Sequence, residues 1–407
     1  MLEDETVLDG TFLNAAAFKA EALRLGAADA GLAEAGPLTA EWPYLQAYLT
    51  AGAQGGMTYL TRSPETRCRP DVLLPDVRTV AVCAFSYFPR PDLYAYHPRI
   101  ARFAQGEDYH RVIRRFLKQL TAYVIQRHPD ARCRGFVDTA PILEKAWAVR
   151  AGLGRIGRNN LLQHPRLGSY IFLGVLLTDV PANAYDHAAE SAGEAVAAGG
   201  LTSDITAGKP TDKTATAGLT ANITAGRPTD RAATAGITAN ITAGSPTNRA
   251  ATAGITPTAA GAGTPLSGLL PDRCRRCRAC VDACPTGALS LERAPRLRAD
   301  NCLAYATIEQ RADEQGRKRF PALRPQAAGA PPPAIFGCDV CQTVCPANRP
   351  AAAEKPHPAF IPAPGLAEMT RSDFARLDEA AFQQRFARSA IRRAGTDGLK
   401  ANLSLWQ

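Results

Sequence analysis

The chain has 407 residues, 46% of them hydrophobic, and its 47 Lys and Arg against 38 Asp and Glu give a formal net charge of +9. This length is enough for two or three domains with ample cores. Residues 1–20 lack a charged segment followed by an apolar one, and no apolar run approaches the length that spans a bilayer. Composition therefore argues against an exported or membrane-spanning protein and predicts a soluble, cytoplasmic one.

The positive charge is concentrated in one segment. Between His97 and Tyr170 there are 14 Lys and Arg against 5 Asp and Glu, an excess of +9. Such a concentration favours a polyanionic partner such as nucleic acid, through contacts with phosphates and release of counterions. The alternative is a solvated, arginine-rich surface, and charge alone does not decide between them.

The first elements are predicted from apolar spacing. Residues 11–35 are expected to hold an amphipathic helix that ends at Gly26. The positions expected to face the core are Phe12, Ala16, Ala20 and Leu23. Residues 78–87 are rich in β-branched and aromatic side chains and lie between two prolines, so they are expected to form a strand.

Residues 109–127 are expected to form a helix with one buried face. The residues expected to be buried recur every four positions: Val112, Phe116, Leu120 and Val124. A strand is expected at 133–138, a helix at 142–151, and a nearly continuous apolar strand, typical of the centre of a sheet, at 169–177. Strands alternating with helices predict an α/β domain over residues 1–185.

Residues 186–266 break this pattern. They are built largely of Ala, Thr and Gly and contain an 18-residue repeat that begins at Ile205, Ile223 and Ile241. Few large side chains are available for burial, and the density of Gly and Pro disfavours a stable helix. We expect a flexible insertion without a catalytic role.

Eight of the eleven cysteines lie near the C-terminal end in a pattern typical of iron-sulfur proteins. One run is Cys274-x2-Cys277-x2-Cys280-x3-Cys284-Pro, another is Cys338-x2-Cys341-x3-Cys345-Pro, and Cys302 lies between them. Eight thiolates are what two 4Fe-4S clusters require. Structural zinc prefers ligands in pairs and disulfides need an oxidising compartment, so both alternatives are disfavoured.

The spacing also divides these cysteines into two sets, because a cysteine before proline in such a run usually binds the other cluster. The first predicted ligand set is Cys274, Cys277, Cys280 and Cys345, and the second is Cys284, Cys302, Cys338 and Cys341. A cluster domain is expected over residues 267–350, stabilised largely by cluster ligation, and a basic helical tail over 351–407. The remaining Cys68, Cys83 and Cys133 are expected to be partly buried thiols without a catalytic role.

Asp138 is the sharpest polar candidate outside the cysteines. It ends the predicted strand 133–138, at the edge where open α/β sheets bind ligands, and a buried carboxyl group there can deliver a proton. The same residue suits the N-cap of a helix that starts near Pro141. From the residues alone, the N-cap interpretation is the favoured one.

Five segments together closely resemble epoxyqueuosine reductase, the iron-sulfur and cobalamin family that completes queuosine synthesis in tRNA. They are VDTAPILEKAWAVRAGLGRIGRNN, LGSYIFLG, CRRCRACVDACPTGAL, NCLAYATIE and GCDVCQTVCPAN, in the family's order. The resemblance covers residues 10–180 and 269–407. It implies an α/β (α+β) cobalamin-binding reductase domain, a ferredoxin-like domain with two 4Fe-4S clusters and a short helical C-terminal tail.

The resemblance also implies roles for residues and partners. Asp138 matches the family's proton donor, Arg67 matches a cobalamin contact, and the motif that lines the cofactor and substrate pocket contains Lys145, Arg158 and Asn159. The implied reaction reduces epoxyqueuosine to queuosine at the wobble position of tRNA. Electrons would pass from an external single-electron donor such as flavodoxin or ferredoxin through both clusters to cobalamin. The implied partner is the anticodon stem-loop of queuosine-type tRNAs, and a monomer is expected.

Two features depart from the family pattern. The insertion 186–266 stands where the family usually has a short linker, and Arg155, Arg158 and Asn160 replace a commoner aromatic residue, Lys and Thr. Two other functions are considered. A corrinoid reductase similar to reductive dehalogenases would typically carry a twin-arginine export signal, which residues 1–20 lack. A ferredoxin-type electron carrier would show cluster spectra without bound corrinoid.

Overall fold

The computed structural model describes residues 11–88, 100–187, 274, 276–291, 295–311, 313, 318–324, 335–349, 355–366 and 368–406. The chain divides into one unit of Met1–Glu194 and Gly263–Gln407 and a second of Ala195–Ala262, and every described residue belongs to the first. The predicted repeat insertion 186–266, apart from its first two residues, lies outside the described residues and stays a prediction. No helix within the described ranges is long and apolar enough to cross a membrane.

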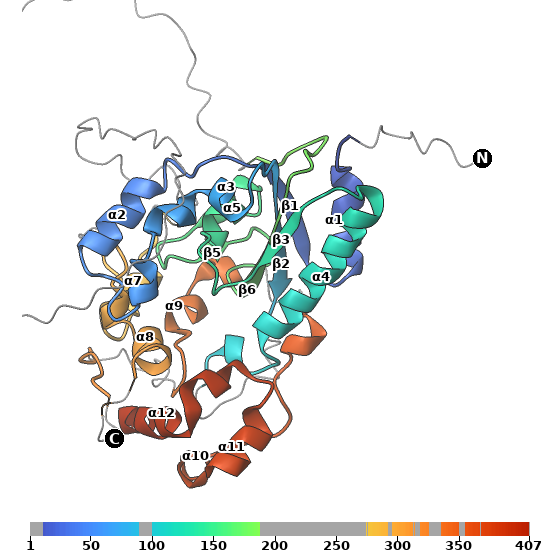
Figure 1. Cartoon of the computed structure of the whole chain (residues 1–407). Coiled ribbons are helices and arrows are strands. Elements are labelled where there is room, and N and C mark those ends of the chain that lie inside the picture. Colours follow the sequence, from blue (N-terminus) through green and yellow to red (C-terminus); the bar gives the residue numbers. More distant parts are fainter. Residues whose placement is uncertain are drawn as a thin grey trace, which may run out of the picture. The chain divides into compact units, whose positions relative to one another are not determined.

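A four-stranded antiparallel sheet forms the centre of the N-terminal part, with strand order β1-β2-β6-β3 (Figure 1). The strands are β1 (Asp29–Glu34), β2 (Thr79–Ser86), β3 (Cys133–Phe136) and β6 (Ile171–Thr178). Asp29 lies opposite Ala84, and Thr178 lies opposite both Thr79 and Cys133. The strands predicted at 78–87, 133–138 and 169–177 are confirmed. Because every pair is antiparallel, the domain takes the α+β form of the predicted class.

Helices cover both faces of this sheet (Figure 1). One face carries α1 (Ala15–Arg24) and α4 (Tyr109–Arg127), and the other carries α2 (Trp42–Thr50), α3 (Pro70–Leu73) and α5 (Glu144–Arg150). Successive side chains of β2 alternate between the two cores: Cys83 and Phe85 pack with α4, whereas Val82 and Ala84 pack with α5. All eight residues of β2 are buried, because helices cover both faces of this central strand.

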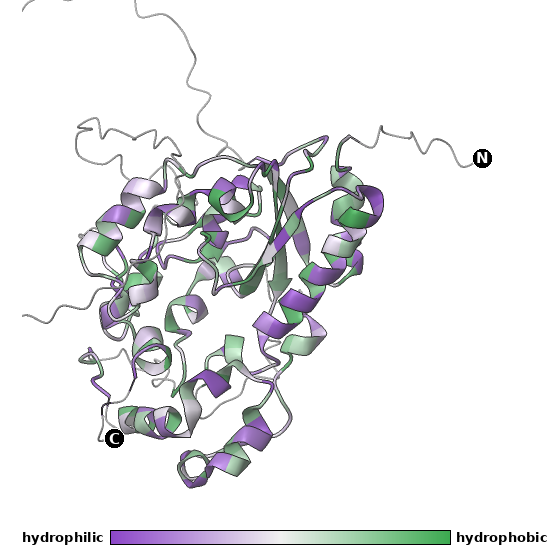
Figure 2. Ribbon diagram, in the orientation of Figure 1, coloured by the Kyte–Doolittle hydropathy of each residue, from purple (hydrophilic) through white to green (hydrophobic). Residues whose placement is uncertain are grey.

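Helix α4 has the bounds that its sequence predicts. Its four predicted core residues are all buried, and the helix begins where the side chain of Asp108 accepts a hydrogen bond from the backbone N–H of His110. The opposite face is exposed and basic, with Arg111, Arg114, Arg115 and Lys118. The 19-residue helix is therefore amphipathic, with one apolar face toward the core and one charged face exposed. In Figure 2 these faces appear as alternating green and purple along the helix.

The N-terminal prediction is wrong in two respects. Helix α1 buries Ala15, Phe18 and Ala22. All four predicted core residues are exposed instead, namely Phe12, Ala16, Ala20 and Leu23. Residues 29–34, which fall in the range 11–35 but after the expected helix end at Gly26, form strand β1. Alanines occur on every side of α1, so the apolar spacing did not distinguish its buried face, and Asp-Ala-Gly-Leu-Ala-Glu contains no β-branched residue to indicate a strand.

A short hairpin, β4 (Arg155–Ile156) and β5 (Leu162–Gln163), carries the segment RNN between its strands. Gly154 precedes it with φ of 146°, and a Cβ at this position would lie 2.4 Å from the carbonyl oxygen of Gln163. Only glycine accommodates both the positive φ and this close backbone approach. The hairpin projects Arg158 and Asn159 toward the cysteine segments.

The cysteine segments form short helices around a small core. These are α7 (Ala279–Asp282), α8 (Leu303–Ile308) and α9 (Val340–Thr343), and one cluster of buried residues consists mainly of Cys280, Val281, Cys284, Ala288 and Leu289. The C-terminal helices α10 (Arg371–Arg376), α11 (Glu379–Phe386) and α12 (Gly395–Asn402) share a further core with Ile100 and Phe336. Short 3-10 helices lie at 58–60, 64–68, 102–104, 299–301, 346–348, 358–360, 390–394 and 403–406.

Candidate functional site

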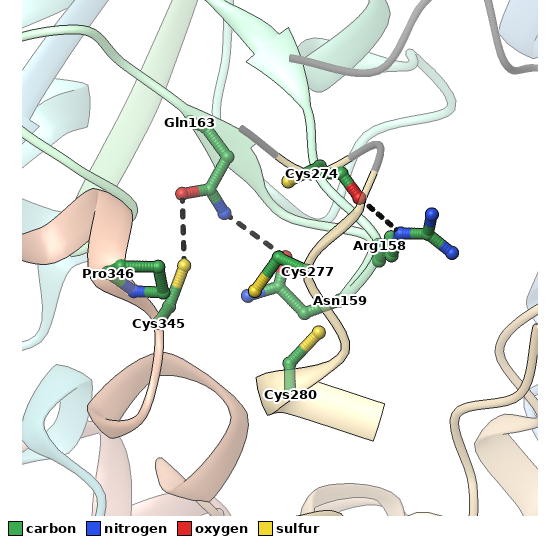
Figure 3. A pocket seen from close by; sticks show the side chains of 8 residues that line it. All are labelled: Arg158, Asn159, Gln163, Cys274, Cys277, Cys280, Cys345 and Pro346. Carbon is green, nitrogen blue, oxygen red and sulfur yellow. Dashed lines mark hydrogen bonds between the residues drawn. The ribbon is translucent and has the colours of Figure 1, made fainter. Parts of the chain in front are cut away.

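Four cysteines surround one cavity. Cys274, Cys277, Cys280 and Cys345 line a space of about 330 Å³, including the part open to solvent, together with Arg158, Asn159, Gln163 and Pro346 (Figure 3). Three of these cysteines come from the first run, and Cys345 comes from the second, 61 residues beyond Cys284. The structure thus brings together the four cysteines of the first predicted ligand set.

These thiols surround a space rather than a point. Among the described residues, no three Cys, His, Asp or Glu side chains converge closely enough to hold a single metal ion. Burial, together with the neighbouring thiols of Cys345, Cys274 and Cys277, raises the pKa of the Cys280 thiol to about 12. A group that stabilises thiolates is needed to overcome this effect, and iron in a cluster supplies that stabilisation.

The second predicted set is also gathered in one place. Burial raises the pKa of Cys338 to about 12, and the nearby Cys302 and Cys284 contribute to that rise. Burial likewise raises the pKa of Cys341 well above its usual value, with contributions from Cys338, Cys302, Cys280 and Cys284. Mutual repulsion of this kind requires proximity, so these thiols lie close together, and Cys280 lies within electrostatic reach of both sets.

A buried polar network fastens the second cysteine run to the sheet. The backbone N–H of Ser169 donates to Asn348 Oδ1 at 2.6 Å, and Gln342 Nε2 donates to the carbonyl oxygen of Ser169 at 2.9 Å. Asn348 Nδ2 donates in turn to the carbonyl oxygen of Gln342 at 2.7 Å. Since all three residues are buried and satisfied, this network fixes the helix α9 and its cysteines against the start of β6.

Asp138 lies two residues beyond β3, with φ of 51° in the left-handed region. Its Oδ2 accepts hydrogen bonds from the hydroxyl of Tyr109 at 2.8 Å and from Nε2 of His110 at 3.1 Å, and half of its side chain stays exposed. The helix that follows begins at Glu144, and its N-cap is Leu143. The N-cap interpretation of Asp138 is therefore wrong, and the carboxylate points toward helix α4 instead.

His110 connects two carboxylates. Its Nδ1 lies 2.8 Å from Asp108 Oδ1, and its Nε2 faces Asp138. Burial acts to lower the pKa of His110, but the hydrogen bonds with Asp108 and Asp138 outweigh burial and raise that pKa to about 9. Burial acts to raise the pKa of Asp138, but hydrogen bonds from His110 and Tyr109 outweigh it and hold that pKa below its usual range. The pair is accordingly a carboxylate and an imidazolium at neutral pH.

Three more ionisable side chains lie near Asp138, of which Arg67 is buried and Glu144 and Lys145 are half-buried. Arg67 NH2 donates to the carbonyl oxygen of Tyr59 at 3.0 Å, and Lys145 Nζ donates to that of Asn160 at 2.6 Å. Burial raises the pKa of Glu144 to about 8, helped by the charge of Asp138, and burial lowers the pKa of Lys145. Arg67 Nε and Glu144 Oε1 are buried and have no hydrogen-bond partner among the described residues. A polar ligand would satisfy both atoms.

A second cavity of about 740 Å³, including its solvent-open part, lies between α2, α5 and the hairpin. Its lining combines apolar groups such as Ala146, Val149 and Ile156 with the charged Glu41, Arg158 and Arg296. The buried Oε2 of Glu41 has no hydrogen-bond partner in the described part of the chain, although Arg150 NH2 lies 3.7 Å away. Such a space suits a large ligand with both apolar and polar parts.

The predicted cofactor residues do not all lie together. Arg67, Asp138 and Lys145 belong to the charged cluster beside α5, and Arg158 lines both cavities while its Nε donates to the carbonyl oxygen of Cys274 at 2.5 Å. Asn159 lines the cysteine cavity and is not among the residues of the second cavity. The structure therefore groups Asn159 with the cysteines.

The basic tail is partly neutralised by ion pairs. Arg388 NH2 lies 2.8 Å from Glu107, and Arg393 NH2 lies 2.8 Å from Glu309. These pairs join the C-terminal helices to the segments that flank α4 and α8. The exposed cations of α4 are thus a better candidate than the tail for a continuous basic surface.

Sequence reasoning missed Tyr109, His110 and Glu144 as site residues. The sequence Asp-Tyr-His at the start of the strongest predicted helix was the one available signal, because a helix start presents these side chains at a sheet edge. The contacts of Tyr109 and His110 with Asp138 span 29 and 28 residues, so no local pattern contains them. Glu144 was hidden because nothing in its sequence context indicates burial.

Comparison with protein-family models gives two matches. Residues 67–139 match a family described as "Epoxyqueuosine reductase QueG, DUF1730". Residues 273–348 match a "4Fe-4S double cluster binding domain", which spans all eight cysteines of the two sets. The first match contains Arg67, Tyr109, His110 and Asp138.

Whole-length relatives agree with these matches. An epoxyqueuosine reductase of Gloeobacter violaceus is 31% identical over 397 residues, which cover 95% of this chain and 94% of that protein. One from Cellulophaga algicola is 28% identical over 387 residues and 95% of each chain. The fold is similar to a crystal structure of an epoxyqueuosine reductase with an epoxyqueuosine-modified tRNA-Tyr stem loop, with TM-score 0.63, 21% identity, and coverage of 96% of this chain and 80% of the other.

Proposed function

The chain belongs to the epoxyqueuosine reductase family, and we propose from this premise how its residues reduce epoxyqueuosine to queuosine in tRNA. Two 4Fe-4S clusters and cobalamin are its cofactors. The observation that carries the assignment of roles is the position of Asp138. Its carboxylate is held by Tyr109 and His110 beside the buried or half-buried ionisable side chains of Arg67, Glu144 and Lys145, in the same unit as two four-cysteine sets.

The residues present fit both kinds of cofactor. Cys274, Cys277, Cys280 and Cys345 would hold one cluster around their cavity, and Cys284, Cys302, Cys338 and Cys341 would hold the other. Cobalamin carries amide groups around an apolar ring, and the unsatisfied Arg67 Nε, Glu144 Oε1 and Glu41 Oε2 offer a donor and acceptors for such amides. When bound, cobalamin supplies the redox chemistry at the epoxide.

The reaction consumes protons as well as electrons. Converting the epoxide to an alkene and water takes two electrons and two protons, and negative charge develops on the departing oxygen. Asp138 is the proton donor in this proposal, because it is the carboxyl group that stays half exposed while its Oδ2 contacts two other proton-bearing groups, Tyr109 and His110. Asp138 is ionised without substrate, so it must first receive a proton.

His110 is the residue that supplies this proton. As an imidazolium it stores a proton 3.1 Å from Asp138 Oδ2, and Asp108 on its other side stabilises that charged form. Transfer to Asp138 becomes favourable when negative charge develops on the substrate oxygen nearby. The hydrogen-bonded series Asp108–His110–Asp138 thus holds a proton on His110 at neutral pH, while Asp138 itself stays ionised until substrate reacts.

Turnover is expected to depend on the protonation of His110. Because its pKa is raised to about 9, the imidazolium is present below that pH and is lost above it. The rate should be flat from neutral pH to about 8 and then fall about tenfold per pH unit above about 9. Replacing His110 with glutamine should lower the rate about 100-fold and remove this fall. Nucleoside mass spectrometry of the tRNA across pH measures both effects.

A matched control exists at the other end of the same helix. His128 is the C-cap residue of α4, and His128→Gln should keep both the rate and the pH profile of the wild type. An unchanged break near pH 9 in His110→Gln would assign it to another group. The pH at which the rate begins to fall reports the titration of His110 and Asp138 together, because the two groups are coupled.

The exposed face of α4 is the proposed contact for tRNA phosphates. Arg111, Arg114, Arg115 and Lys118 lie on one side of the helix whose first residues contact Asp138. A stem-loop held by this face would place its wobble nucleotide near the acid, with the base turned out of its stack.

Raising the salt concentration is therefore expected to weaken tRNA binding steeply. Each phosphate contact contributes about 0.7–0.9 to the slope of log affinity against log salt. The double variant Arg111→Gln, Arg115→Gln should lower this slope by about 2 relative to the wild type. Arg371→Gln, an exposed cation on α10, is the control and should leave the slope unchanged. Equal slopes in all three proteins, measured by filter binding, would remove α4 from the interface.

The proposed function is tested directly by conversion of the modified nucleoside. Anaerobic incubation of the reconstituted chain, cobalamin and a strong reductant with epoxyqueuosine-containing tRNA should yield queuosine. No conversion with both clusters and corrinoid present would contradict the assignment. A flavodoxin or ferredoxin is the proposed donor of single electrons, the chain is proposed to act as a monomer, and the cytoplasm, where tRNA is available, is its proposed location.

A further inference from the structure

Gln163 is a buried amide side chain at the edge of the first cysteine cavity. It ends strand β5 and points into the space between Cys345 and Asn159 (Figure 3). Cys345 Sγ lies 3.7 Å from Gln163 Oε1, and Gln163 Nε2 donates to Asn159 Oδ1 at 3.1 Å. Asn159 Nδ2 reaches the carbonyl oxygen of Cys341 at 3.5 Å. The two amides thus connect a cysteine of each predicted ligand set.

The direction of the hydrogen bond between Gln163 and Cys345 depends on the protonation of the sulfur. A neutral thiol at Cys345 would donate its proton to Gln163 Oε1. A cysteine that binds iron does so as a thiolate and has no proton to donate. A carbonyl oxygen that faced this thiolate would be repelled, so the thiolate requires the N–H end of the Gln163 amide.

A half-turn of the amide resolves this conflict without moving the backbone. Exchanging O and N at the end of Gln163 keeps the shape of the side chain and presents Nε2 to the sulfur. Asn159 can turn in the same way and donate Nδ2 to Gln163 Oε1. This exchange costs the long hydrogen bonds from Leu161 N to Asn159 Oδ1 (3.3 Å) and from Asn159 Nδ2 to Cys341 O (3.5 Å), and it leaves a donor facing a donor at the first place and an acceptor facing an acceptor at the second. It gains a donor to an anionic sulfur in a buried site, where such a bond is strong.

We propose that Gln163 donates an N–H···S hydrogen bond to the cluster-bound Cys345 and raises the reduction potential of the cluster held by Cys274, Cys277, Cys280 and Cys345. This inference rests on the proposed ligand sets. Hydrogen bonds to the sulfurs are among the factors that set cluster potentials, because they stabilise the more negative, reduced state. Asn159 holds the amide of Gln163 in the donating orientation. Gln163 and Asn159 therefore change the reduction potential of one cluster relative to that of the other, and this difference influences the direction of electron transfer.

The test is a redox titration of the reconstituted two-cluster protein, followed by electron paramagnetic resonance. Gln163→Leu and Gln163→Met both remove the amide, and methionine keeps the length of the side chain. In both variants, the oxidised-to-reduced ratio of one cluster at a fixed potential should rise about tenfold, which is a shift of about 59 mV for a one-electron couple. The other cluster should keep its wild-type ratio within about twofold, since Gln163 contacts none of its ligands directly.

Several results would overturn this inference. Unchanged potentials in both variants, with wild-type iron content, would show that Gln163 does not donate to the cluster. A shift in Gln163→Leu alone would assign the effect to packing, and loss of iron from both variants would assign Gln163 to cluster assembly. Because the titration needs neither tRNA nor turnover, a failure here is distinct from a failure to convert epoxyqueuosine.

Discussion

Replacing Asp138 with asparagine is expected to lower the rate of epoxyqueuosine reduction about 1,000-fold, within the range typical of removing a general acid. This loss corresponds to about 4 kcal/mol of transition-state stabilisation. Iron content, corrinoid binding and the affinity for tRNA should stay at the level of the wild type. The rate is measured by single-turnover nucleoside mass spectrometry, so that product release does not limit it.

Asparagine is the appropriate substitute because of the backbone at this position. Asp138 has φ of 51°, a conformation that asparagine adopts far more readily than alanine. The amide oxygen of asparagine can still accept hydrogen bonds from Tyr109 and His110, so their positions are preserved. The variant removes the transferable proton and little else, whereas alanine would add backbone strain and leave the Tyr109 hydroxyl without its partner.

Asp76 provides a matched control for this substitution. It also has a positive φ, of 60°, and its carboxylate pairs with Arg132, but its side chain is 81% exposed and lies outside both cavities. Asp76→Asn should keep the full rate. If Asp138→Asn kept it as well, the proton would have to come from another group, and the neighbouring Tyr109 and Glu144 would be the next candidates.

The fold was predictable from sequence where a pattern was both strong and local. Helix α4 and strand β2 have regular apolar patterns, and each element forms close to its predicted bounds. The buried face of helix α1 was predicted wrongly because alanines occur on every side of the helix. Strand β1 was missed because its residue types do not favour a strand, and its pairing with β2 holds it in that conformation. Antiparallel pairing was not visible either, because it depends on contacts between strands that are distant in sequence.

The site residues were likewise predictable only where the signal lay in the local sequence. The cysteines were found because their ligand spacing is written in the chain, and Asp138 was found as one residue with two interpretations. The choice between them depended on where the carboxylate points, and this is fixed by Tyr109 and His110 from another element. Gln163 gives no sequence signal at all, because its importance depends on a cysteine 182 residues away.

Replacing Cys280 with alanine is expected to reduce bound iron from about eight to about four atoms per chain and to abolish turnover. Cys280 is one of the four thiols around the first cavity, and a cluster left with three ligands is expected to be lost during purification. Loss of that cluster interrupts the path of single electrons to the reaction site. Iron and sulfide analysis gives the cluster content, and the control Cys133→Ala, a half-buried thiol on β3, should leave iron and turnover unchanged.

Cysteine-to-alanine variants also test how the eight cysteines are divided between the two clusters. Cys280 and Cys284 are four residues apart in one run, yet they belong to different predicted sets, whereas Cys280 and Cys345 are 65 residues apart and line the same cavity. Cys280→Ala and Cys345→Ala should therefore remove the same resonance signal, and Cys284→Ala should remove the other. If Cys345→Ala instead removed the same signal as Cys284→Ala, the assignment of Cys345 to the first ligand set would be wrong. Gln163 would then raise the reduction potential of the other cluster.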